Sequence, residues 1–377
     1  MKRFTDTIKR ISAFEITFRR WCFLVIFASA AIIGGAVTLV FTVDPHYRYR
    51  LPSFYDTVYY EVYATDPRLL KELDYNTFFI GSSMTRNFFL EDVDRTLGVK
   101  SAKFAAAGAT TADLVKFCRL ASEAKGDSLE RIIFSLDIYS MNKPAAEAHY
   151  KDFDYLYRSD LKEEYRYFFS RMTYSHMFYL LKRKLRPKRK RKHETDINRM
   201  FSTEYDGMKF GWDAVMKDAL RNVNIRHTMT PENPEAFEEN LYNQLLAVIA
   251  ENPSKRFTVY LAPYHVYTYC QSEQFGEADG LIKQRSRVMK ELLKCPNVKL
   301  FDYQTDREIV CNDSYFSDVQ HFGSVAARLI LKKLASGKRQ ILSENCVDAN
   351  EAELRALIAE HMPRYYDDLK KYQEQQK

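Results

Sequence analysis

The longest apolar segment of the chain lies near its N-terminus. Residues 21–43 contain no charged side chain in 23 positions. As a helix rising about 1.5 Å per residue they would extend roughly 34 Å, which is enough to cross the hydrocarbon core of a membrane. A cleaved signal peptide is the competing interpretation, because Ala28-Ser29-Ala30 resembles a cleavage site. The apolar run continues well past that tripeptide, so the pattern favours an uncleaved transmembrane helix.

Basic residues are distributed unequally around this segment. Residues 1–20 carry six lysines and arginines, whereas only Arg48 and Arg50 closely follow the apolar run. Positive charge gathers on the cytoplasmic side of membrane helices. We therefore predict a single-pass protein of the cell membrane, with residues 1–20 in the cytoplasm, residues 21–43 in the membrane and residues 44–377 outside the cytoplasm.

Shorter apolar runs alternate with segments of helical periodicity in the rest of the chain. Buried strands are predicted for residues 77–81, 101–107, 131–136, 256–262 and 298–303. Helices are predicted for residues 88–97, 111–124, 280–293 and 323–334. Strands that alternate with helices indicate an α/β fold, in which helices cover both faces of a parallel sheet.

Three segments flank or interrupt this alternation. Residues 44–75 are rich in aromatic side chains and are predicted to form a membrane-proximal segment. Residues 143–253 read as an insertion within a domain of residues 76–342, folded as a helical cap or flap. Residues 343–377 form a predicted C-terminal helical tail, whose amphipathic part begins near residue 350.

The net charge of +7 is concentrated in two places. Residues 1–20 carry +4 and residues 182–192 carry +9, so the remainder carries −6. A mildly acidic body with two basic segments argues against a nucleic-acid-binding domain. The run at 182–192 is interpreted either as a solvated surface loop or as a contact for an anionic envelope polymer or lipid headgroups.

The six cysteines leave the redox compartment open. Cys22 lies in the apolar segment, and the odd number of five that remain means that at least one is unpaired or pairs between chains. The sequence has no C-x-x-C pair, so nothing in it indicates a metal site. We predict neither a metal nor an organic cofactor.

Candidate chemistry begins where the first predicted strand ends, in 78-FFIGSSMTRNF-88. Ligands of parallel α/β sheets bind beyond the carboxyl ends of the strands, and the N–H groups of a following helix start can stabilise an oxyanion. Gly81 permits a tight turn there, and Ser82 or Ser83 is then a candidate nucleophile. The alternative is that these serines only cap a helix.

A serine nucleophile needs a base, and the best candidate lies in 317-SDVQHFG-323. Asp318 and His321 follow the last predicted strand, three residues apart, so the carboxylate can reach the imidazole from the same side of a turn. Asp318 would orient His321, and His321 would take the proton of the serine. An Asp-x-x-His pattern alone occurs often by chance. Its predicted position after another strand makes a catalytic role more credible.

Taken in order, these blocks resemble the SGNH (GDSL-like) hydrolase superfamily over residues 76–140 and 255–335. Gly81-Ser82-Ser83 looks like the family's Gly-Asp-Ser, which makes Ser83 the nucleophile and Ser82 the replacement of Asp. The superfamily shares several short sequence motifs, called blocks. Gly108 looks like the glycine of its second block, and Asp318 and His321 look like its final Asp-x-x-His. The resemblance implies a flavodoxin-like, three-layer sheet and an oxyanion held by the N–H groups of Ser83 and Gly108.

The third block departs from the family pattern. Asp137 in 135-SLDIYSMN-142 stands where the family has the asparagine of Gly-x-Asn-Asp, and a carboxylate donates to an oxyanion only when protonated. Asn142 is the candidate replacement. Ser82, Tyr264 and His265 are the candidates for contacting substrate; each has an ordinary structural role as its alternative.

Gly-Ser-Ser after a single N-terminal span looks like the membrane-anchored branch of this superfamily. That branch includes the D-alanyl transfer protein of teichoic acid modification and proteins of polysaccharide O-acetylation. The resemblance implies a serine esterase or O-acyltransferase that acts on a cell-envelope glycan or teichoic acid. The alternative is a catalytically inactive binding protein that assists a membrane-bound O-acyltransferase.

Overall fold

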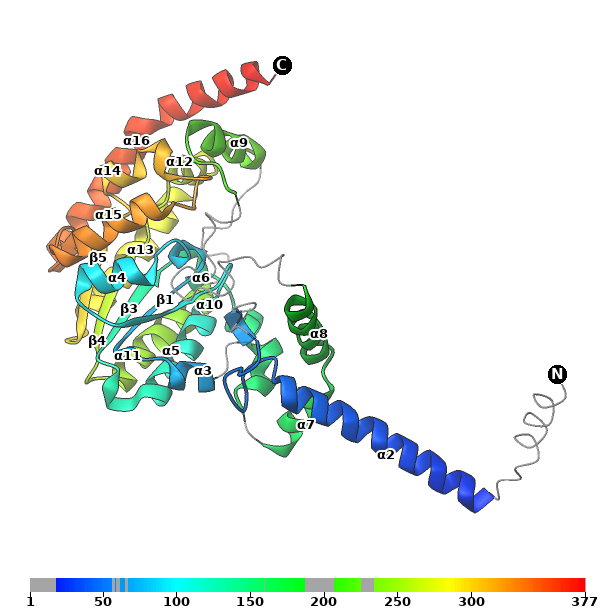
Figure 1. The fold of residues 1–377 in the computed structure, drawn as a ribbon. Helices are drawn as coiled ribbons and strands as arrows, with labels where there is room; N and C mark the ends of the chain where they lie inside the picture. The colour runs from blue at the N-terminus through cyan, green and yellow to red at the C-terminus, as the bar shows by residue number, and fades with distance from the viewer. Residues whose placement is uncertain are drawn as a thin grey trace.

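The protein consists of an α/β domain, a projecting N-terminal helix and a small helical module that joins them (Figure 1). The structure is a computed structural model and describes residues 18–55, 58, 62–64, 67–158, 160–186, 207–224 and 234–376. The basic segment at 1–17 and residues 187–192 of the second basic run lie outside the described residues.

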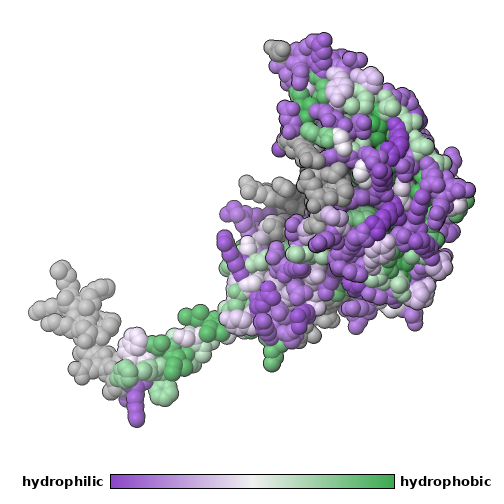
Figure 2. Space-filling model, turned by 180° about the vertical axis from the view of Figure 1, so that it is seen from behind, coloured by the Kyte–Doolittle hydropathy of each residue, from purple (hydrophilic) through white to green (hydrophobic). Residues whose placement is uncertain are grey.

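The projecting helix is α2, Phe18–Val43. It is long and apolar enough to cross a membrane, and among the described helices it alone meets both conditions. Apolar side chains cover most of its length (Figure 2), and of its residues Val40 and Val43 are buried. The apolar pattern therefore predicted this helix correctly.

A six-stranded sheet forms the centre of the α/β domain, with the strand order β2-β1-β3-β4-β5-β6. The strands are β1 Thr77–Gly81, β2 Ser101–Ala105, β3 Arg131–Leu136, β4 Arg256–Leu261, β5 Val298–Asp302 and β6 Gln340–Ile341. The first five pair in parallel, and β6 runs antiparallel to β5. All five residues of β1 are buried, as expected for a strand covered on both faces. All five predicted strands are confirmed, each with bounds that agree within two residues.

Helices cover both faces of this sheet. Helices α4 (Leu90–Leu97) and α15 (Ser324–Ala335) contact each other on one side of the strands, while α5 (Thr111–Lys125) and α11 (Ala247–Glu251) contact each other on the opposite side (Figure 1). Thr110 caps α5 in a reciprocal capping box with Asp113, which explains why the helix begins there. Shorter elements join these layers: η1 Val62–Ala64, α3 Pro67–Glu72, η2 Ser83–Thr85, η3 Gly126–Ser128, α6 Ile138–Met141, η4 Ala145–Glu147, α10 Pro234–Glu238, the π-helical η9 Glu239–Leu246, α14 Arg307–Val310 and η10 Asp313–Tyr315.

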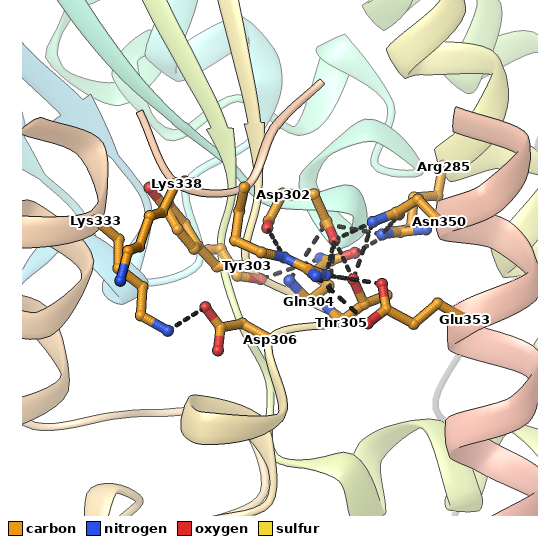
Figure 3. A network of polar contacts seen from close by, with 12 residues as sticks. Arg285, Asp302, Tyr303, Gln304, Thr305, Asp306, Lys333, Lys338, Asn350 and Glu353 are labelled. Atoms are coloured by element: carbon orange, nitrogen blue, oxygen red, sulfur yellow. Dashed lines mark hydrogen bonds and ion pairs between the residues drawn. The ribbon is translucent and has the colours of Figure 1, made fainter. Parts of the chain in front are cut away.

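The C-terminal helix α16, Glu344–Gln375, belongs to the α/β domain. It packs against α9 (Trp212–Asn222), α12 (Val266–Gln274) and α13 (Ala278–Leu293). A network of polar contacts joins it to the end of β5 (Figure 3). The predicted tail is thus a helix, but it begins earlier than the amphipathic pattern indicated and is packed against the rest of the domain.

The predicted insertion is divided between two places instead of forming one cap. Its η5 (His149–Leu156), α7 (Leu161–Phe169) and α8 (Arg171–Leu185) contain the residues that pack with Val40 and Val43 at the C-terminal end of α2. We call these three elements, together with residues 44–55, the collar. The later part of the insertion supplies α9 to α11, which pack on the α/β domain.

Arg48 fixes the membrane-proximal segment to the insertion within the collar. Its guanidinium donates to the Glu164 carboxylate at 2.9 Å and to the carbonyl oxygen of Tyr155 at 3.0 Å. Asp44 accepts hydrogen bonds from the backbone N–H groups of three residues that follow it and from the Tyr167 hydroxyl. The membrane-proximal segment is therefore a folded junction.

Candidate active site

The site begins at the carboxyl end of β1, where Gly81 allows the chain to turn sharply. A Cβ atom on Gly81 would lie 2.0 Å from Thr85 Oγ1 and 2.7 Å from Ser135 Cβ. Real Cβ atoms do not approach other atoms that closely, so any other residue would push η2 away from β3. Glycine is thus required because the backbone turns directly against the neighbouring strand.

The two serines after Gly81 have different environments. Ser82 is buried, caps η2 and donates a hydrogen bond from its hydroxyl to Asp137 Oδ2 at 3.1 Å. Ser83 is the first residue of η2 and is only partly buried. Its Oγ lies 2.8 Å from His321 Nε2. Capping therefore falls to Ser82, and the serine that faces a base is Ser83.

The loop that carries Asp318 and His321 is clamped at its base. Phe316 and Phe322 pair in an isolated antiparallel bridge, and the Ser317 N–H donates to the His321 carbonyl at 2.9 Å. Within the loop Asp318 Oδ1 accepts the backbone N–H groups of Gln320 and His321, both at 2.7 Å. The Asp-x-x-His spacing forms a turn closed by its own carboxylate.

A second contact brings this loop to the end of β1, more than 230 residues away in sequence. The Asn87 side-chain amide donates to the Phe322 carbonyl at 2.7 Å, and the rings of Phe88 and Phe322 meet edge to face. These residues lie a few positions after Ser83 and directly after His321. The contact therefore fixes the serine relative to the histidine.

Ser83, His321 and Asp318 form a continuous hydrogen-bonded chain. His321 Nδ1 lies 2.8 Å from Asp318 Oδ2, and its other ring nitrogen faces Ser83 Oγ. Both distances are those of good hydrogen bonds. Because an ionised carboxylate only accepts, Nδ1 carries the proton and the lone pair of Nε2 points at the serine. The three residues predicted as catalytic are thus brought together.

Burial and the mutual attraction of the two side chains shift the pKa values of His321 and Asp318 in opposite directions. Burial alone would lower the pKa of His321, but the hydrogen bond and negative charge of Asp318, supported by Asp137, raise it above the ordinary value. Burial likewise favours a higher pKa for Asp318, and its hydrogen bonds to His321 outweigh that effect and hold the pKa below its usual range. Asp318 is therefore ionised at neutral pH and stabilises a protonated imidazole.

Asp137, which follows β3, lies beside this chain as a hydrogen-bond acceptor. Its Oδ1 accepts the Tyr139 N–H at 3.0 Å and the Tyr264 hydroxyl, and its Oδ2 accepts the Ser82 hydroxyl. These bonds use both carboxyl oxygens as acceptors, so the side chain is not arranged to donate to an oxyanion. The structure thus gives Asp137 a supporting position, and Ser82 and Tyr264, predicted to contact substrate, are buried as its donors.

The other two oxyanion candidates lie in different surroundings. Gly108 has a positive φ of 66°, which favours glycine, and its carbonyl oxygen accepts a hydrogen bond from Lys143 Nζ at 2.9 Å. Asn142 ends α6 and exchanges amide hydrogen bonds with Gln284 at 3.0 and 3.2 Å. Gly108 is exposed after β2, the neighbour of β1, whereas the Asn142 amide is engaged by α13.

His265 supports the loop that carries Asp318 and His321, and it is buried. Its Nε2 lies 2.9 Å from Asp313 Oδ1, and its backbone N–H donates to the Val319 carbonyl at 3.0 Å. Burial is the main reason that the pKa of His265 is lowered, although Asp313 opposes it. His265 therefore holds the loop between Asp318 and His321 in place and has no surface for substrate.

Sequence reasoning missed Asn87, Asp313 and Gln320, which complete the surroundings of the site. Gln320 Nε2 donates to the Tyr139 hydroxyl at 3.2 Å and so joins the loop that carries Asp318 and His321 to α6. Asn87 stands in the same motif as Ser83, but nothing in the sequence indicates that its partner is the Phe322 carbonyl.

No model of a known protein family matches the chain, and a search of curated proteins finds no match either.

Proposed function

We propose that the protein is a membrane-anchored serine esterase or O-acyltransferase of the SGNH type. The observation that carries the proposal is the chain of two 2.8 Å contacts from Ser83 through His321 to Asp318. A serine hydroxyl, an imidazole in the correct tautomer and an ionised carboxylate are the groups that acyl transfer requires. The strand order β2-β1-β3-β4-β5, with Ser83 at the end of β1, agrees with a flavodoxin-like sheet of this type.

The reaction would proceed in two steps through an acyl-enzyme. Ser83 Oγ attacks the acyl carbonyl carbon while its proton passes to His321 Nε2, and the imidazolium is stabilised by Asp318. The tetrahedral intermediate collapses when the bond to the leaving alcohol or thiol breaks and His321 returns the proton to that group. Water or an acceptor hydroxyl, deprotonated by His321, then attacks the Ser83 ester and releases the serine.

The oxyanion would be stabilised mainly by backbone donors. Ser83 opens η2, and the first N–H groups of a helix have no acceptor within the helix. Gly108, after the neighbouring strand β2, is the proposed source of the second N–H donor. The carboxylate of Asp137 offers no donor, so we infer a two-donor site that would be weaker than one with a third, amide donor.

We further propose that the acyl donor or acceptor is a glycan or teichoic acid of the cell envelope. Support comes from α2, whose length and composition suit a membrane anchor, and from the basic residues that begin at the end of α8. With the N-terminus in the cytoplasm, the α/β domain would face the envelope polymers, and the basic run would attract anionic ones.

The test is the hydrolysis of a chromogenic acetyl ester by the full chain in detergent micelles. We expect Ser83→Ala and His321→Ala to lower kcat/KM by about 10³-fold or more, because the removal of either group leaves only residual catalysis. Ser336→Ala, an exposed serine that caps the end of α15, is the matched control and should retain the full rate. Equal rates for the unchanged protein and Ser83→Ala would contradict the esterase activity.

Asp137 favours one other candidate, an SGNH-like binding protein that assists a membrane-bound O-acyltransferase without catalysing the reaction itself. A fluorophosphonate probe separates the two functions, because it labels an activated serine without needing the natural acceptor. Labelling of the unchanged chain, absent in Ser83→Ala, would support a transferase even where ester hydrolysis is slow. A chain that is neither labelled nor active would support the binding protein.

A further inference from the structure

Helix α7 of the collar exposes a stripe of large apolar side chains. Leu161, Tyr165 and Phe169 are 89%, 65% and 40% exposed. They follow one another at intervals of four residues, which places them on one face of the helix. The rings of Tyr165 and Phe169 contact each other at 5.0 Å between centroids. We call these three residues the α7 stripe.

The opposite face of α7 is firmly packed. Tyr167 is fully buried and donates to Asp44 Oδ1 at 2.7 Å, and Glu164 forms an ion pair with Arg48 at 2.9 Å. The orientation of the helix is therefore fixed by contacts on its inner face. The α7 stripe is on the outside because polar groups anchor the other side.

The position of α7 relates the stripe to the membrane helix. Both α7 and α8 contact α2, and Figure 1 shows them on either side of its C-terminal end. A membrane core of about 30 Å requires roughly 20 helical residues. A span that begins near Trp21 would therefore leave the hydrocarbon near residue 40, at the level of the collar that buries Val40 and Val43.

Basic side chains surround the apolar positions. On α7 the exposed residues between members of the stripe are Lys162 and Arg166, and Arg166 also pairs with the Glu163 carboxylate at 2.9 Å. On α8 the exposed apolar residues Phe178 and Leu185 alternate with exposed basic ones. The exposed basic residues of α8 are Arg171, Lys182 and Lys184. Aromatic and leucine side chains flanked by lysine and arginine are typical of helices that lie in the membrane interface.

We propose that the α7 stripe lies in the headgroup region of the bilayer that α2 crosses, with anionic lipid as its partner. Tyr167 of α7 packs in one cluster with Val40 and Val43, so the stripe on the other face of this helix lies within about one helix diameter of the point where α2 leaves the hydrocarbon. One bilayer surface would therefore reach both. The surrounding positive charges match phosphate headgroups, whereas a protein partner would need complementary acidic groups of its own. The protein would thus be attached at two places, and the second would fix the tilt of the α/β domain above the membrane.

This inference does not depend on the reaction at Ser83, but it does require α2 to be inserted. Tryptophan fluorescence can test both, because the chain has only Trp21, in α2, and Trp212, in α9. The full chain is placed in nanodiscs of phosphatidylcholine and phosphatidylglycerol whose acyl chains are brominated near the headgroup. Three variants each retain a single tryptophan: Trp212→Phe retains Trp21, and Trp21→Phe/Trp212→Phe is combined with either Tyr165→Trp or Tyr366→Trp.

Bromine quenches only tryptophans that lie at the depth of the lipid chains. We expect the Tyr165→Trp variant to lose emission to a degree comparable with the variant that retains Trp21, and to emit at shorter wavelength than the Tyr366→Trp variant in the same nanodiscs. Tyr366 is 48% exposed on α16 and serves as the matched control, whose replacement should not be quenched. Leu161→Ser/Phe169→Ser in the Tyr165→Trp variant should reduce the quenching, as should replacement of phosphatidylglycerol by phosphatidylcholine.

Two outcomes would overturn the proposal. If the variant with Trp21 is quenched and the Tyr165→Trp variant is not, α2 is inserted but the α7 stripe lies away from lipid, covered by another protein or by water. If neither is quenched, α2 does not enter the bilayer and the two-place attachment fails. Ester hydrolysis in the same nanodiscs reports separately on the proposed function.

Discussion

Asp137 places a carboxylate near His321, the histidine that would gain and lose a proton in the proposed reaction. Ser82 and Tyr264 hold this carboxylate in place with their hydroxyl groups, and the N–H of Tyr139 holds it from the helix that it caps. Its negative charge contributes to the raised pKa of His321. A base with a higher pKa is stronger but is more often protonated near neutral pH, so Asp137 affects the pH range in which the site can act.

Asp137→Asn should shift the rising limb of the pH–kcat/KM profile to lower pH. The substitution removes a charge that favours the imidazolium, so His321 loses its proton at lower pH and becomes available as a base earlier. We also expect about 1–3 kcal/mol lower stability, because Ser82 and Tyr264 both donate and an amide has only one acceptor oxygen. NMR titration of the His321 imidazole measures the decrease in its pKa directly, even in a chain with little activity.

Asp348→Asn is the control for this substitution. Asp348 pairs with Lys290 at the surface of α16, so its replacement removes the same charge at a distance from the site. Its profile should coincide with that of the unchanged protein. A limb that stays in place in Asp137→Asn, or one that moves to higher pH, would show that Asp137 does not influence His321.

At the scale of elements, α16 is attached to the sheet by buried polar groups as well as by apolar packing. Arg285 from α13 and Asp302 at the end of β5 form a fully buried ion pair at 2.8 Å. Asn350 from α16 accepts from Arg285 and donates to Asp302 Oδ2 at 2.8 Å (Figure 3). A buried pair contributes little net stability, but the loss of one member leaves an uncompensated charge.

Arg285→Met should therefore destabilise the protein by about 3–5 kcal/mol, because the buried Asp302 carboxylate then keeps only the longer 3.8 Å ion pair with Arg339, which is partly exposed. Arg285→Met/Asp302→Asn should recover part of this loss, since a neutral amide needs no cation and its oxygen can still accept from Thr305 and Asn350. Urea unfolding of the full chain in micelles, followed by circular dichroism, measures both. Lys290→Met, on the exposed side of α13, is the control and should change stability by less than about 1 kcal/mol. A double variant as unstable as the single one would contradict this account.

The elements that the sequence predicted well are those whose own side chains determine them. The strand at residues 77–81 is an uninterrupted apolar run, and α5 begins at a complete capping box. In contrast, β6 has two residues and exists only because β5 offers an edge beside it. The collar was missed because its contacts, such as that of Arg48 with Glu164, join segments more than 100 residues apart.

The same distinction applies to the candidate site. Ser83 could be predicted as a candidate because it closely follows a buried strand, β1. Asp318 and His321 could be predicted because they form one short motif, although α14 and η10 separate it from the end of β5. The roles of Ser82 and Tyr264 could not, because both depend on where Asp137 points. A short polar motif shows where chemistry can occur, but it does not show which of its neighbours are buried.

At the scale of the whole molecule, the described residues form two apolar cores, and Phe153 and Tyr157 pack against both. The larger core surrounds the sheet, and the smaller one joins α2 to the collar. The smaller core contains two facing histidines, His46 and His176, whose Nδ1 atoms lie 3.2 Å apart. One neutral imidazole can donate to another, but two imidazolium ions repel each other at this distance. The junction between membrane helix and domain therefore depends on these histidines remaining uncharged.

Mild acid should loosen the collar before the sheet. Burial lowers the pKa of His176 to about 4, and burial together with the charge of His176 lowers that of His46, against 6.5 for an ordinary histidine. Between these values the unfolded collar binds protons that the folded collar excludes, so its stability is full above pH 6.5 and falls as the pH decreases towards 4. Hydrogen exchange of peptides from α8 and β3, compared at pH 7.5 and 5 after correction for the intrinsic rate, measures this difference.

Of these two peptides, we expect only the one from α8 to exchange faster at pH 5. The His176→Gln variant should show a smaller increase in exchange. An equal increase in β3 would contradict a local effect.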